Sequence, residues 1–510
     1  MKKIFFIFGL LSFLFSEEHR NKCGLNLSNQ NRNTPPSCSD YIESSGGNFR
    51  IHYGTCTSTV ESSYFNQEVN ATTSYLNLVA DAAEHSRSVL LDMGFNQAAS
   101  DNDGIYDIYL SNRDNGDYGV NFPSSEGGSF VIIDNNYSNY SCGPCLIEPS
   151  ATELMQITVA HEFFHAVQRT YVSINADNAN KYFWELSSTW FEDVAYPEIN
   201  DYLNWYNGYN GDYLMNPEND ISDSQWYNGY ALAMFGHYLT KKYDQVDNQE
   251  NSNIMRLIWE DFDGAGTDEA LVSIDNTLSS NYNSSFSVAW SDFNTRNIYN
   301  GAFYNTNNSL YYYEDQQYLP QINVVSPQYM SNSLTTDEIV TEWGEVEILS
   351  YQLNSNDNAF ITLDLSDSQD CGDFFGGFDD FVGYLAIESI IENNWHRFYD
   401  LSELYLDSSP RIIALDPGDK FYFVLANIEA QTNLEHCLQI PITYSAANIY
   451  TLGDLNLDLE IDILDLVLLI DVILDDVNIS EYQFSIIDLN NDSTLNIIDA
   501  VAIIHVILNS

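Results

Sequence analysis

The chain is poor in positive charge. It has 17 lysine and arginine residues against 74 aspartate and glutamate residues, which gives a formal net charge of −57. A surface of this sign repels nucleic-acid phosphates and anionic lipid headgroups, so nucleic acid and membranes are not expected as partners. It attracts cations instead, and the stretches rich in Asp and Asn suit calcium.

Long apolar runs are also missing, except at the N-terminus. Lys2 and Lys3 precede an apolar run over residues 4–15. This is the pattern of a secretory signal peptide, and the run is too short to span a bilayer. We therefore expect residues 1–16 to be a signal peptide. The mature chain is expected to be soluble and secreted, either extracellular or tethered at the cell surface.

Cysteine is scarce, with 7 residues in 510. Export favours disulfide bonds, and the odd count leaves at least one thiol free or bonded to another molecule. Cys371 and Cys437 lie in one C-terminal region and are the pair we favour. Cys142 and Cys145 have the spacing of a redox motif. They lack its strand-to-helix context, so a loop disulfide is the favoured interpretation.

The length and pattern predict several domains. A chain of 510 residues with 44% hydrophobic content exceeds one compact core. Residues 17–47 read as an irregular leader, and whether they act as a pro-segment stays open. Residues 48–304 mix strands and helices in an α+β pattern. Residues 305–450 alternate short strands with turns, which predicts an all-β sandwich serving as a spacer or binding module. A two-fold repeat fills residues 451–510.

Periodicity places the individual elements. In the α+β region we expect strands at residues 48–53, 105–110 and 129–134. We expect helices at residues 70–93, from 150, from 181 to before 197, and at 226–243 and 253–262. Ser150 and Glu153 form a capping box that begins the second of these helices. In the β region we expect strands at residues 345–353, 360–365, 382–387, 411–415, 420–425 and 437–444.

The helix from residue 150 carries the motif with the clearest chemistry. His161, Glu162 and His165 form His-Glu-x-x-His. Residues four apart on a helix share one face, so both imidazoles can bind one zinc ion. Glu162 can take a proton from a zinc-activated water and pass it to the leaving amine. The helix is apolar on nearly every side and is therefore expected to be buried, where an unpaired polar group costs about 2–7 kcal/mol. A bound metal ion removes that cost. The alternative to a zinc site is a buried His/Glu cluster that serves the structure alone.

Glu185 lies 20 positions after His165, on the helix expected from residue 181. With the His-Glu-x-x-His motif, this spacing resembles the gluzincins, the thermolysin-type zinc peptidases. The resemblance covers about residues 48–300 and implies a zincin-like fold with Glu185 as the third zinc ligand. Thermolysin-type enzymes have an Asn directly before this Glu, where this chain has Trp184. They have an Asp four residues after it, where this chain has Thr189. The second helix is more similar to that of bacterial secreted proteases with a Trp-Glu…Trp-x-Glu pattern.

Further site residues follow from the same two helices and their neighbours. Glu192 shares a face with Glu185, and it either orients a zinc-binding histidine or is solvated. Tyr227, Tyr230 and His237 are candidates for stabilising the oxyanion, although aromatic residues at this spacing also suit a core. The resemblance to zincins further implies that the strand at residues 129–134 is the edge strand that pairs with a peptide substrate.

The C-terminal repeat places oxygen-bearing side chains at positions 1, 3, 5, 9 and 12 of two loops, 34 residues apart. A backbone carbonyl is available at position 7 of each loop, and each loop leads into an apolar helix, at residues 463–474 and 497–508. This pattern suits calcium, and the alternative is a polar repeat without metal. Asp462 and Asn496 occupy position 9 of the two loops. The predicted calcium ligands are Asp454, Asn456, Asp458, Glu460, Asp462, Asp465, Asp488, Asn490, Asp492, Thr494, Asn496 and Asp499.

The repeat resembles a type I dockerin, in which duplicated calcium loops end in Asp at position 12. Leu459 and Ser493 replace the usual Gly at position 6. The resemblance implies a small helical domain that binds a cohesin-type scaffold protein. A self-contained tail stiffened by calcium is the alternative.

The leading hypothesis is therefore a multidomain, secreted zinc endopeptidase acting on protein or peptide substrates. The competing hypothesis is a non-catalytic surface or scaffold-associated binding protein built on a zincin fold. The sequence specifies neither the cleavage preference nor the cohesin partner.

Overall fold

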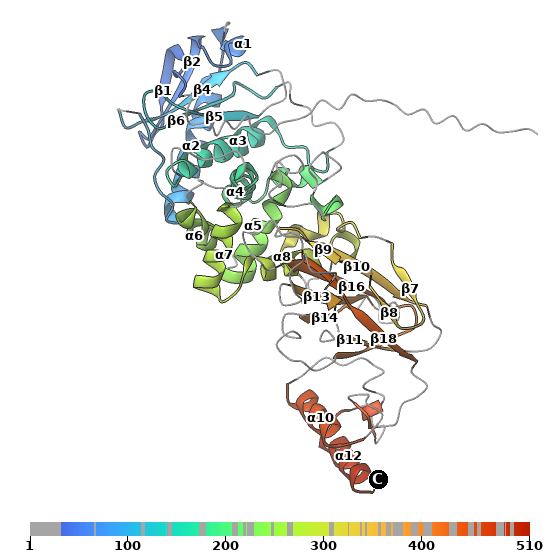
Figure 1. Ribbon diagram of the computed structural model, residues 1–510. Helices are drawn as coiled ribbons and strands as arrows, with labels where there is room; N and C mark the ends of the chain where they lie inside the picture. The colour runs from blue at the N-terminus through green and yellow to red at the C-terminus, as the bar shows by residue number, and fades with distance from the viewer. Residues whose placement is uncertain are drawn as a thin grey trace, which may run out of the picture. The chain divides into compact units, whose positions relative to one another are not determined.

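The structure is a computed structural model, drawn as a ribbon in Figure 1. The chain divides into two compact units. The first unit contains residues up to 88, 97–144 and 149–169, and the second contains 89–96, 145–148 and all residues from 170. The structure describes residues 32–509 except 66–67, 102, 114–117, 139, 141–144, 173–179, 207–212, 218–220, 222–228, 246–248, 263–268, 305–310, 325, 337–338, 342–343, 355–358, 364–368, 371–380, 389–395, 401–410, 428–435, 447–452, 456–460, 476–483, 485 and 490–493. The expected signal peptide lies outside the described residues.

The first unit is built on one mixed sheet. Its strands run in the order β1-β2-β4-β6-β5, and β3 pairs with β2. Strands β2, β4 and β6 are parallel neighbours, whereas β5 is antiparallel to β6. Every residue of β4 and of β6 is buried, which suits their nearly continuous apolar sequences. The bounds are β1 Ser37–Glu43, β2 Phe49–Thr57, β3 Glu68–Val69, β4 Tyr106–Ser111, β5 Gly119–Pro123 and β6 Ser129–Asp134.

Helix α3, Ala151–Gln168, packs on this sheet. The ring of Phe163 lies 5.0 Å from that of Phe49 on β2 and 5.3 Å from that of Tyr106 on β4, both edge-on. Helix α2, Thr73–Asp92, and the short α1, Ser62–Phe65, complete the helices of this part of the chain. The predicted strands and helices here are confirmed to within a few residues.

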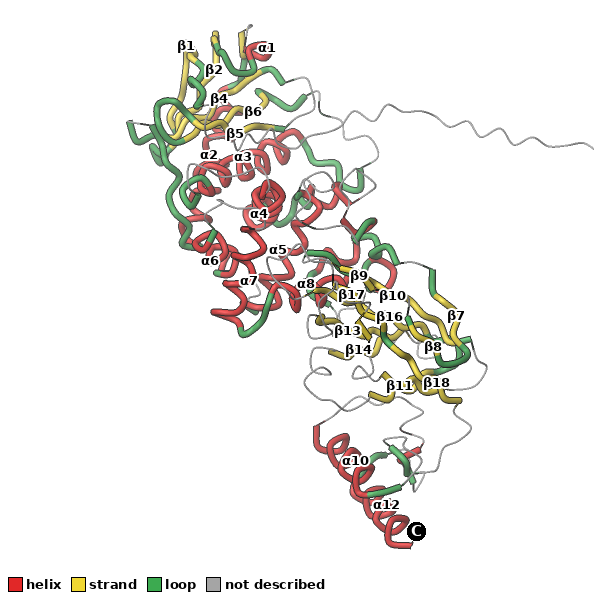
Figure 2. The backbone as a smooth tube through the Cα atoms, in the orientation of Figure 1, coloured by secondary structure: helices red, strands yellow, loops and turns green. Residues whose placement is uncertain are grey.

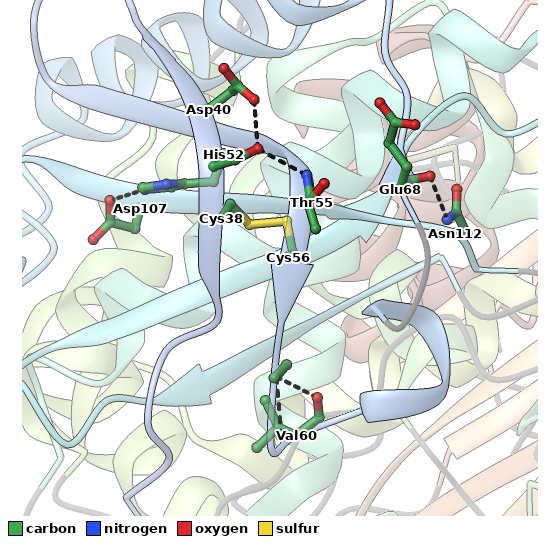
Figure 3. Close-up of a disulfide and its surroundings, with 11 residues drawn as sticks. Cys38, Asp40, His52, Thr55, Cys56, Val60, Glu68, Asp107 and Asn112 are labelled. Carbon is green, nitrogen blue, oxygen red and sulfur yellow. Dashed lines mark hydrogen bonds and ion pairs between the residues drawn. A yellow bond between two sulfur atoms is a disulfide. The ribbon is translucent and has the colours of Figure 1, made fainter.

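The expected irregular leader is wrong in its last part. Residues 37–43 form β1, which pairs antiparallel with β2. A disulfide between Cys38 and Cys56 joins the two strands at this pairing (Figure 3). The sequence pattern missed this strand because its polar residues and exposed position give no alternation of apolar side chains.

The other cysteine predictions fall largely outside the described residues. Cys145 is disulfide-bonded, whereas its expected partner Cys142 is not described. Cys437 lies on β17, His436–Gln439, whereas its expected partner Cys371 is not described. Both proposed pairs therefore stay predictions.

The second unit begins with a helical part (Figure 2). Helix α4 fulfils the prediction of a helix that starts at residue 181 and ends before Pro197. The helix expected over residues 226–243 is shorter: the 3-10 turn η4, Tyr230–Leu232, precedes α5, and the π-helical turn η5, Thr240–Asp244, follows it. Helices α7 and α8 were not predicted. The bounds are α4 Lys181–Ala195, α5 Ala233–Leu239, α6 Ile254–Asp261, α7 Glu269–Tyr282 and α8 Phe286–Asn297.

Strands follow the helices in the second unit. A five-stranded sheet runs in the order β14-β13-β16-β10-β7 and a four-stranded sheet in the order β15-β11-β18-β8; a smaller sheet has the order β12-β17-β9. The two larger sheets share one apolar core, to which Tyr351, Phe423 and Ile361 contribute. The bounds are β7 Gln328–Met330, β8 Leu334–Thr335, β9 Ile339–Thr341, β10 Glu347–Leu353, β11 Ala359–Leu363, β12 Gln369–Asp370, β13 Phe381–Glu388, β14 His396–Asp400, β15 Arg411–Leu415, β16 Lys420–Asn427 and β18 Pro441–Ala446.

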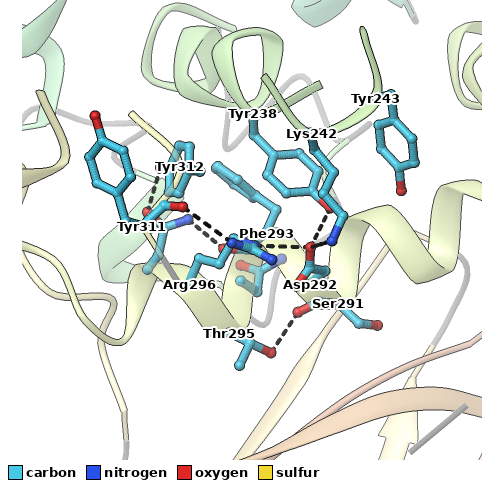
Figure 4. Close-up of polar contacts among 12 residues, drawn as sticks. Tyr238, Lys242, Tyr243, Ser291, Asp292, Phe293, Thr295, Arg296, Tyr311 and Tyr312 are labelled. Atoms are coloured by element: carbon cyan, nitrogen blue, oxygen red, sulfur yellow. Dashed lines mark hydrogen bonds and ion pairs between the residues drawn. The ribbon is translucent and has the colours of Figure 1, made fainter. Parts of the chain in front are cut away.

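Helix α8 packs against β13 and β16 and so joins the helical part to the sandwich. The Ser287 hydroxyl on α8 donates to the Asn427 carbonyl at 2.6 Å. On the same helix, Asp292 accepts from Tyr238 at 2.7 Å and pairs with Arg296 and Lys242 (Figure 4). Burial alone would raise the pKa of Asp292, but these two cations hold it below its usual value. Asp292 on α8 is therefore a buried carboxylate with two cationic partners, Arg296 on the same helix and Lys242 on η5.

The last described elements are α10, Ile463–Asp475, and α12, Ile497–Asn509. Both predicted apolar helices are confirmed, and they share a core centred on Leu469 and Ile503. None of the described helices combines the length and apolar character that crossing a membrane requires.

Candidate metal centre

The centre depends on α3, whose start is fixed by its sequence. The Ser150 hydroxyl accepts from the Glu153 amide at 3.3 Å, and the Glu153 carboxylate accepts from the Ser150 amide at 2.6 Å. The predicted capping box is confirmed. From Leu154 to Gln168 nearly every residue is buried, as the apolar sequence predicted. The histidines therefore lie on a helix with little freedom to move.

His161 and His165 lie on one face of α3. Their ring centroids are 4.7 Å apart with planes at 87°, and their side chains are 1% and 0% exposed. Together with the fully buried Glu185 they form a group whose potential ligand atoms all lie within 4.8 Å of one another. This group can hold a metal ion. It consists of the three residues that the sequence singled out as ligands.

The chemistry of the donor set fits a divalent transition metal. Two imidazole nitrogens and one carboxylate oxygen are the ligands of many catalytic zinc sites, in which a fourth position stays open for water or substrate. A buried carboxylate beside two buried imidazoles would be costly without a compensating charge. The set has no excess of oxygen ligands, so it does not fit calcium or magnesium.

A residue that the sequence did not single out orients one ligand. Gln168 Oε1 lies 2.7 Å from His165 Nδ1. An amide oxygen only accepts, so His165 Nδ1 carries the hydrogen and Nε2 keeps its lone pair for a metal. The signal in the sequence was a polar residue three positions after His165 on an otherwise apolar helix.

Glu185 is held on α4 by close packing. Gly229 has φ +93°, and a Cβ built there would come within 2.1 Å of the Tyr182 carbonyl oxygen and 2.8 Å of Glu185 Cβ. Only glycine fits both this backbone conformation and this approach. The neighbouring Trp184 packs edge-on against Trp259 at 5.3 Å, so the residue that departs from the thermolysin-type pattern serves the helical core.

Glu162, the predicted general base and acid, is fully buried beside β5. A Cβ on Gly119 would lie 2.9 Å from Glu162 Cγ and 3.3 Å from its Oε1. Strand β5 therefore approaches Glu162 more closely than a residue with a Cβ at position 119 would allow. Glu192 is also buried, so the alternative of a solvated carboxylate is wrong.

The candidates for an oxyanion ligand have different surroundings. Tyr230 directly follows Gly229, which packs on Glu185, and its ring lies 4.7 Å from that of Trp205. Tyr230 therefore lies on the backbone segment next to a potential ligand. Tyr227 is outside the described residues.

His237 lies in a different buried cluster. Its Nδ1 is 2.7 Å from Gln249 Oε1, its Nε2 is 3.6 Å from Asp193 Oδ2, and its ring stacks on Tyr313 at 4.5 Å. Asp193 is eight residues after Glu185, about 12 Å further along the helix. Burial lowers the pKa of His237 to about 3. These contacts describe a neutral histidine within the core and do not bring it to the metal ligands.

The edge-strand prediction is wrong. Strand β6, residues 129–134, lies between β4 and β5, and β5 ends the order of the sheet. The segment Gly119–Pro123 was missed because a five-residue strand bounded by Gly and Pro gives a weak sequence signal. At its far end, the Asn33 amide donates to the Pro123 carbonyl at 2.8 Å. No described strand pairs with the outer edge of β5.

The predicted calcium ligands are described only in part. Asn456, Asp458, Glu460, Asn490 and Asp492 lie outside the described residues. In the first copy the Asp465 carboxylate accepts from the Asp462 amide at 2.9 Å, and in the second copy Asp499 accepts from the Asn496 amide at 3.0 Å. Asp454, Asp465 and Asp499 are fully buried. The two copies thus fold alike at the start of each helix.

Comparisons with known proteins add little. No protein-family model matches the chain, and no curated protein matches it. Among solved structures it is similar to a family GH115 4-O-methyl-α-glucuronidase with specificity for decorated arabinogalactans, at 9% identity and a TM-score of 0.13. That similarity covers 58% of this chain and 44% of the other, so the chain spans less than half of that enzyme. Neither a fold nor a function follows from a TM-score of this size.

Proposed function

We propose that the chain is a secreted zinc-dependent endopeptidase. The observation that carries the proposal is the buried group of His161, His165 and Glu185, with potential ligand atoms within 4.8 Å of one another. The disulfide between Cys38 and Cys56 and the signal-like residues 1–16 support export. The resemblance of the two-helix motif to gluzincins supports peptide bonds as the substrate.

In this mechanism each residue of the group has one task. His161, His165 and Glu185 would hold the ion, which when bound supplies a Lewis acid that polarises a carbonyl and lowers the pKa of water. The Glu162 carboxylate takes a proton from the attacking water and passes it to the leaving amine nitrogen. Tyr230 is the residue we propose to donate a hydrogen bond to the developing oxyanion.

The substrate strand would pair with β5. This strand ends the sheet, its backbone passes against Glu162, and extended peptides bind exposed sheet edges through main-chain hydrogen bonds. Pro123 lacks an amide hydrogen, so the pairing would use residues 119–122. This assignment places the peptide next to the general base.

The test compares Glu162→Gln with Glu153→Gln on the same helix. The Gln side chain preserves the capping box at residue 153 but cannot act as a base at residue 162. We expect both variants to retain equimolar zinc by mass spectrometry, and only Glu162→Gln to lose casein hydrolysis, by at least a thousandfold. Chelation should abolish wild-type hydrolysis and zinc should restore it. Zinc binding without hydrolysis of casein or of a mixed peptide library would favour the competing hypothesis, a binding protein on the same scaffold.

A calcium-binding tail is a second proposal, carried by Asp499. Its Oδ1 is buried and has no hydrogen-bond partner among the described residues, although its Oδ2 accepts from the Asn496 amide. A buried carboxylate oxygen of this kind suits a hard cation. We expect calcium to slow amide exchange in α12 and Asp499→Ala to remove that effect. Equal exchange with and without calcium would contradict the proposal.

We further propose that this tail tethers the enzyme to a cohesin-type scaffold protein. Both C-terminal helices expose apolar side chains at equivalent positions, namely Ile463, Leu464, Val467, Ile497, Ile498 and Val501. Clusters of this kind on a solvent face indicate a binding surface. Calcium-dependent binding of type I cohesins to immobilised full-length protein should be lost in Val467→Asp/Val501→Asp. If no cohesin binds, the tail is a self-contained calcium-stiffened module.

A further inference from the structure

A single buried amide connects β5 to the helix turn that carries Glu162. Asn121, in the middle of β5, is fully buried and faces α3. Its Nδ2 lies 3.2 Å from the Glu162 carbonyl oxygen, and its Oδ1 accepts from Arg169 Nε at 2.7 Å. Arg169 is the C-cap residue of α3. Asn121 therefore contacts the helix at two points, seven residues apart.

The chemistry of its neighbours fixes the orientation of this amide. The Arg169 guanidinium only donates, so the oxygen of the Asn121 amide must face it. The Glu162 carbonyl only accepts, so the nitrogen must face the helix. The Tyr106 hydroxyl, at 3.1 Å, and the Ser129 hydroxyl, at 3.3 Å, surround the same nitrogen. No other side chain of similar size offers one donor and one acceptor in this arrangement.

The backbone of β5 makes a further contact with the same helix turn. Gly119 lies two residues before Asn121, and residues two apart in a strand face the same side of the sheet. A Cβ on Gly119 would lie 2.7 Å from Thr158 Cγ2 and 2.9 Å from Glu162 Cγ. Strand β5 thus contacts the side chain of Glu162 at Gly119 and its carbonyl at Asn121. The position of the strand and that of the carboxylate are set together.

We propose that Asn121 and Arg169 form a clamp that positions the general base against the substrate-binding strand. Asn121 is a positioning residue, because it touches neither the metal ligands nor the reacting atoms. The proposal rests on the proposed function, since it assigns the clamp to hydrolysis by Glu162. A peptide paired with β5 moves with that strand. Loosening the clamp therefore changes the distance from the carbonyl of the peptide to Glu162, while the pairing between peptide and β5 is kept.

The diagnostic variant is Asn121→Asp, which keeps the size of the side chain and the acceptor for Arg169. It replaces the donor with an oxygen facing the Glu162 carbonyl. The matched control is Asn135→Asp, because Asn135 is a buried amide after β6 that donates to the Asn70 carbonyl at 3.0 Å. In the zinc-loaded full-length chain we expect Asn121→Asp to lower kcat by about 10- to 100-fold, as a displacement near 1 Å can do. KM and zinc content should stay within twofold, and the control should keep its kcat.

A second measurement does not depend on activity. Hydrogen exchange of the metal-free chain should be faster in Asn121→Asp than in wild type over residues 119–123 and in the last turn of α3. Wild-type kcat in Asn121→Asp, or an equal loss in the control, would overturn the clamp. If the wild type hydrolyses no peptide, the proposed function fails on its own, and the exchange data still decide whether Asn121 holds β5: unchanged exchange would overturn that contact.

Discussion

His165 and Gln168 are hydrogen-bonded within α3, with 2.7 Å between Nδ1 and Oε1. The bond holds the imidazole in the tautomer that leaves Nε2 available for a metal. Both side chains are fully buried, so water does not readily replace the amide if it is removed. The affinity of the proposed zinc site should therefore depend on Gln168, which is itself no ligand.

Replacing Gln168 should weaken zinc binding. We expect Gln168→Met, which fills the space without an acceptor, to lower the zinc affinity by about 10- to 100-fold, the usual effect of losing such a partner. Gln168→Glu keeps an acceptor and should bind zinc at least as tightly as wild type. Competition with a chromophoric chelator measures both affinities. Equal affinities for the Met and Glu variants would show that the hydrogen bond has no influence.

A second prediction concerns the glycine that packs on Glu185. Gly229→Ala should displace α4, because its Cβ would overlap the Tyr182 carbonyl and approach Glu185 Cβ. Gly104→Ala is the control, since Gly104 has φ +83° but nothing within 4 Å of its Cβ position. Both variants carry the left-handed strain of about 1–2 kcal/mol.

Only Gly229→Ala should also lose zinc affinity, by at least tenfold. Unfolding by urea measures the shared strain, and chelator competition measures the affinity. A loss of zinc affinity of the same size in Gly104→Ala would mean that general destabilisation, rather than the position of Glu185, is responsible.

The sequence predicted the three members of the metal group because their signal is local. His161 and His165 are one helical turn apart, so helical periodicity is enough to place them together, whereas Glu185 on the next helix was assigned through the resemblance of its spacing to that of the gluzincins. It could not predict Asn121 or Gly119. Their importance arises from the pairing of β5 with β6 and its packing on α3, which bring residues more than 40 positions apart into contact.

The errors have related physical causes. The resemblance to zincins implied that β6 is the edge strand, and the short strand beyond it, β5, was not recognised because it has too few residues to show alternation. His237 was one of three candidates for stabilising the oxyanion, because a histidine on an aromatic helix suits catalysis as well as a core. The contacts with Asp193, Gln249 and Tyr313 favour the core, and no local pattern contains them because they come from three separate segments.

The disulfide between Cys38 and Cys56 should stabilise the first strand pair. It closes a loop between residues 18 positions apart, and a loop of that length predicts about 3 kcal/mol. We expect Cys38→Ser/Cys56→Ser to lower the free energy of unfolding by this amount and to keep the zinc content. Denaturant unfolding checks it, with reduced wild type as the comparison. A loss below about 0.5 kcal/mol would show that the hydrogen bonds between β1 and β2 suffice.

Burial lowers the pKa of His237 to about 3, from its ordinary value near 6.5. Below about pH 6.5 the unfolded chain binds a proton at this histidine, whereas the folded chain stays neutral there until about pH 3. The stability contributed by the neutral histidine is therefore present above pH 6.5 and is lost progressively as the pH falls toward 3.

His237→Asn tests this dependence, because the Asn amide nitrogen can still donate to Gln249 as Nδ1 does. Between pH 7 and pH 4 the free energy of unfolding of the wild type should fall by up to about 3 kcal/mol more than that of the variant, since one pKa unit corresponds to about 1.4 kcal/mol. Urea titrations of both metal-free proteins measure the difference without a contribution from metal release. Asp193, whose pKa is raised by burial, is present in both proteins, so its opposite pH dependence largely cancels. Parallel pH profiles would mean that His237 gains a proton in the folded chain as readily as in the unfolded chain, and that the cluster is open to water.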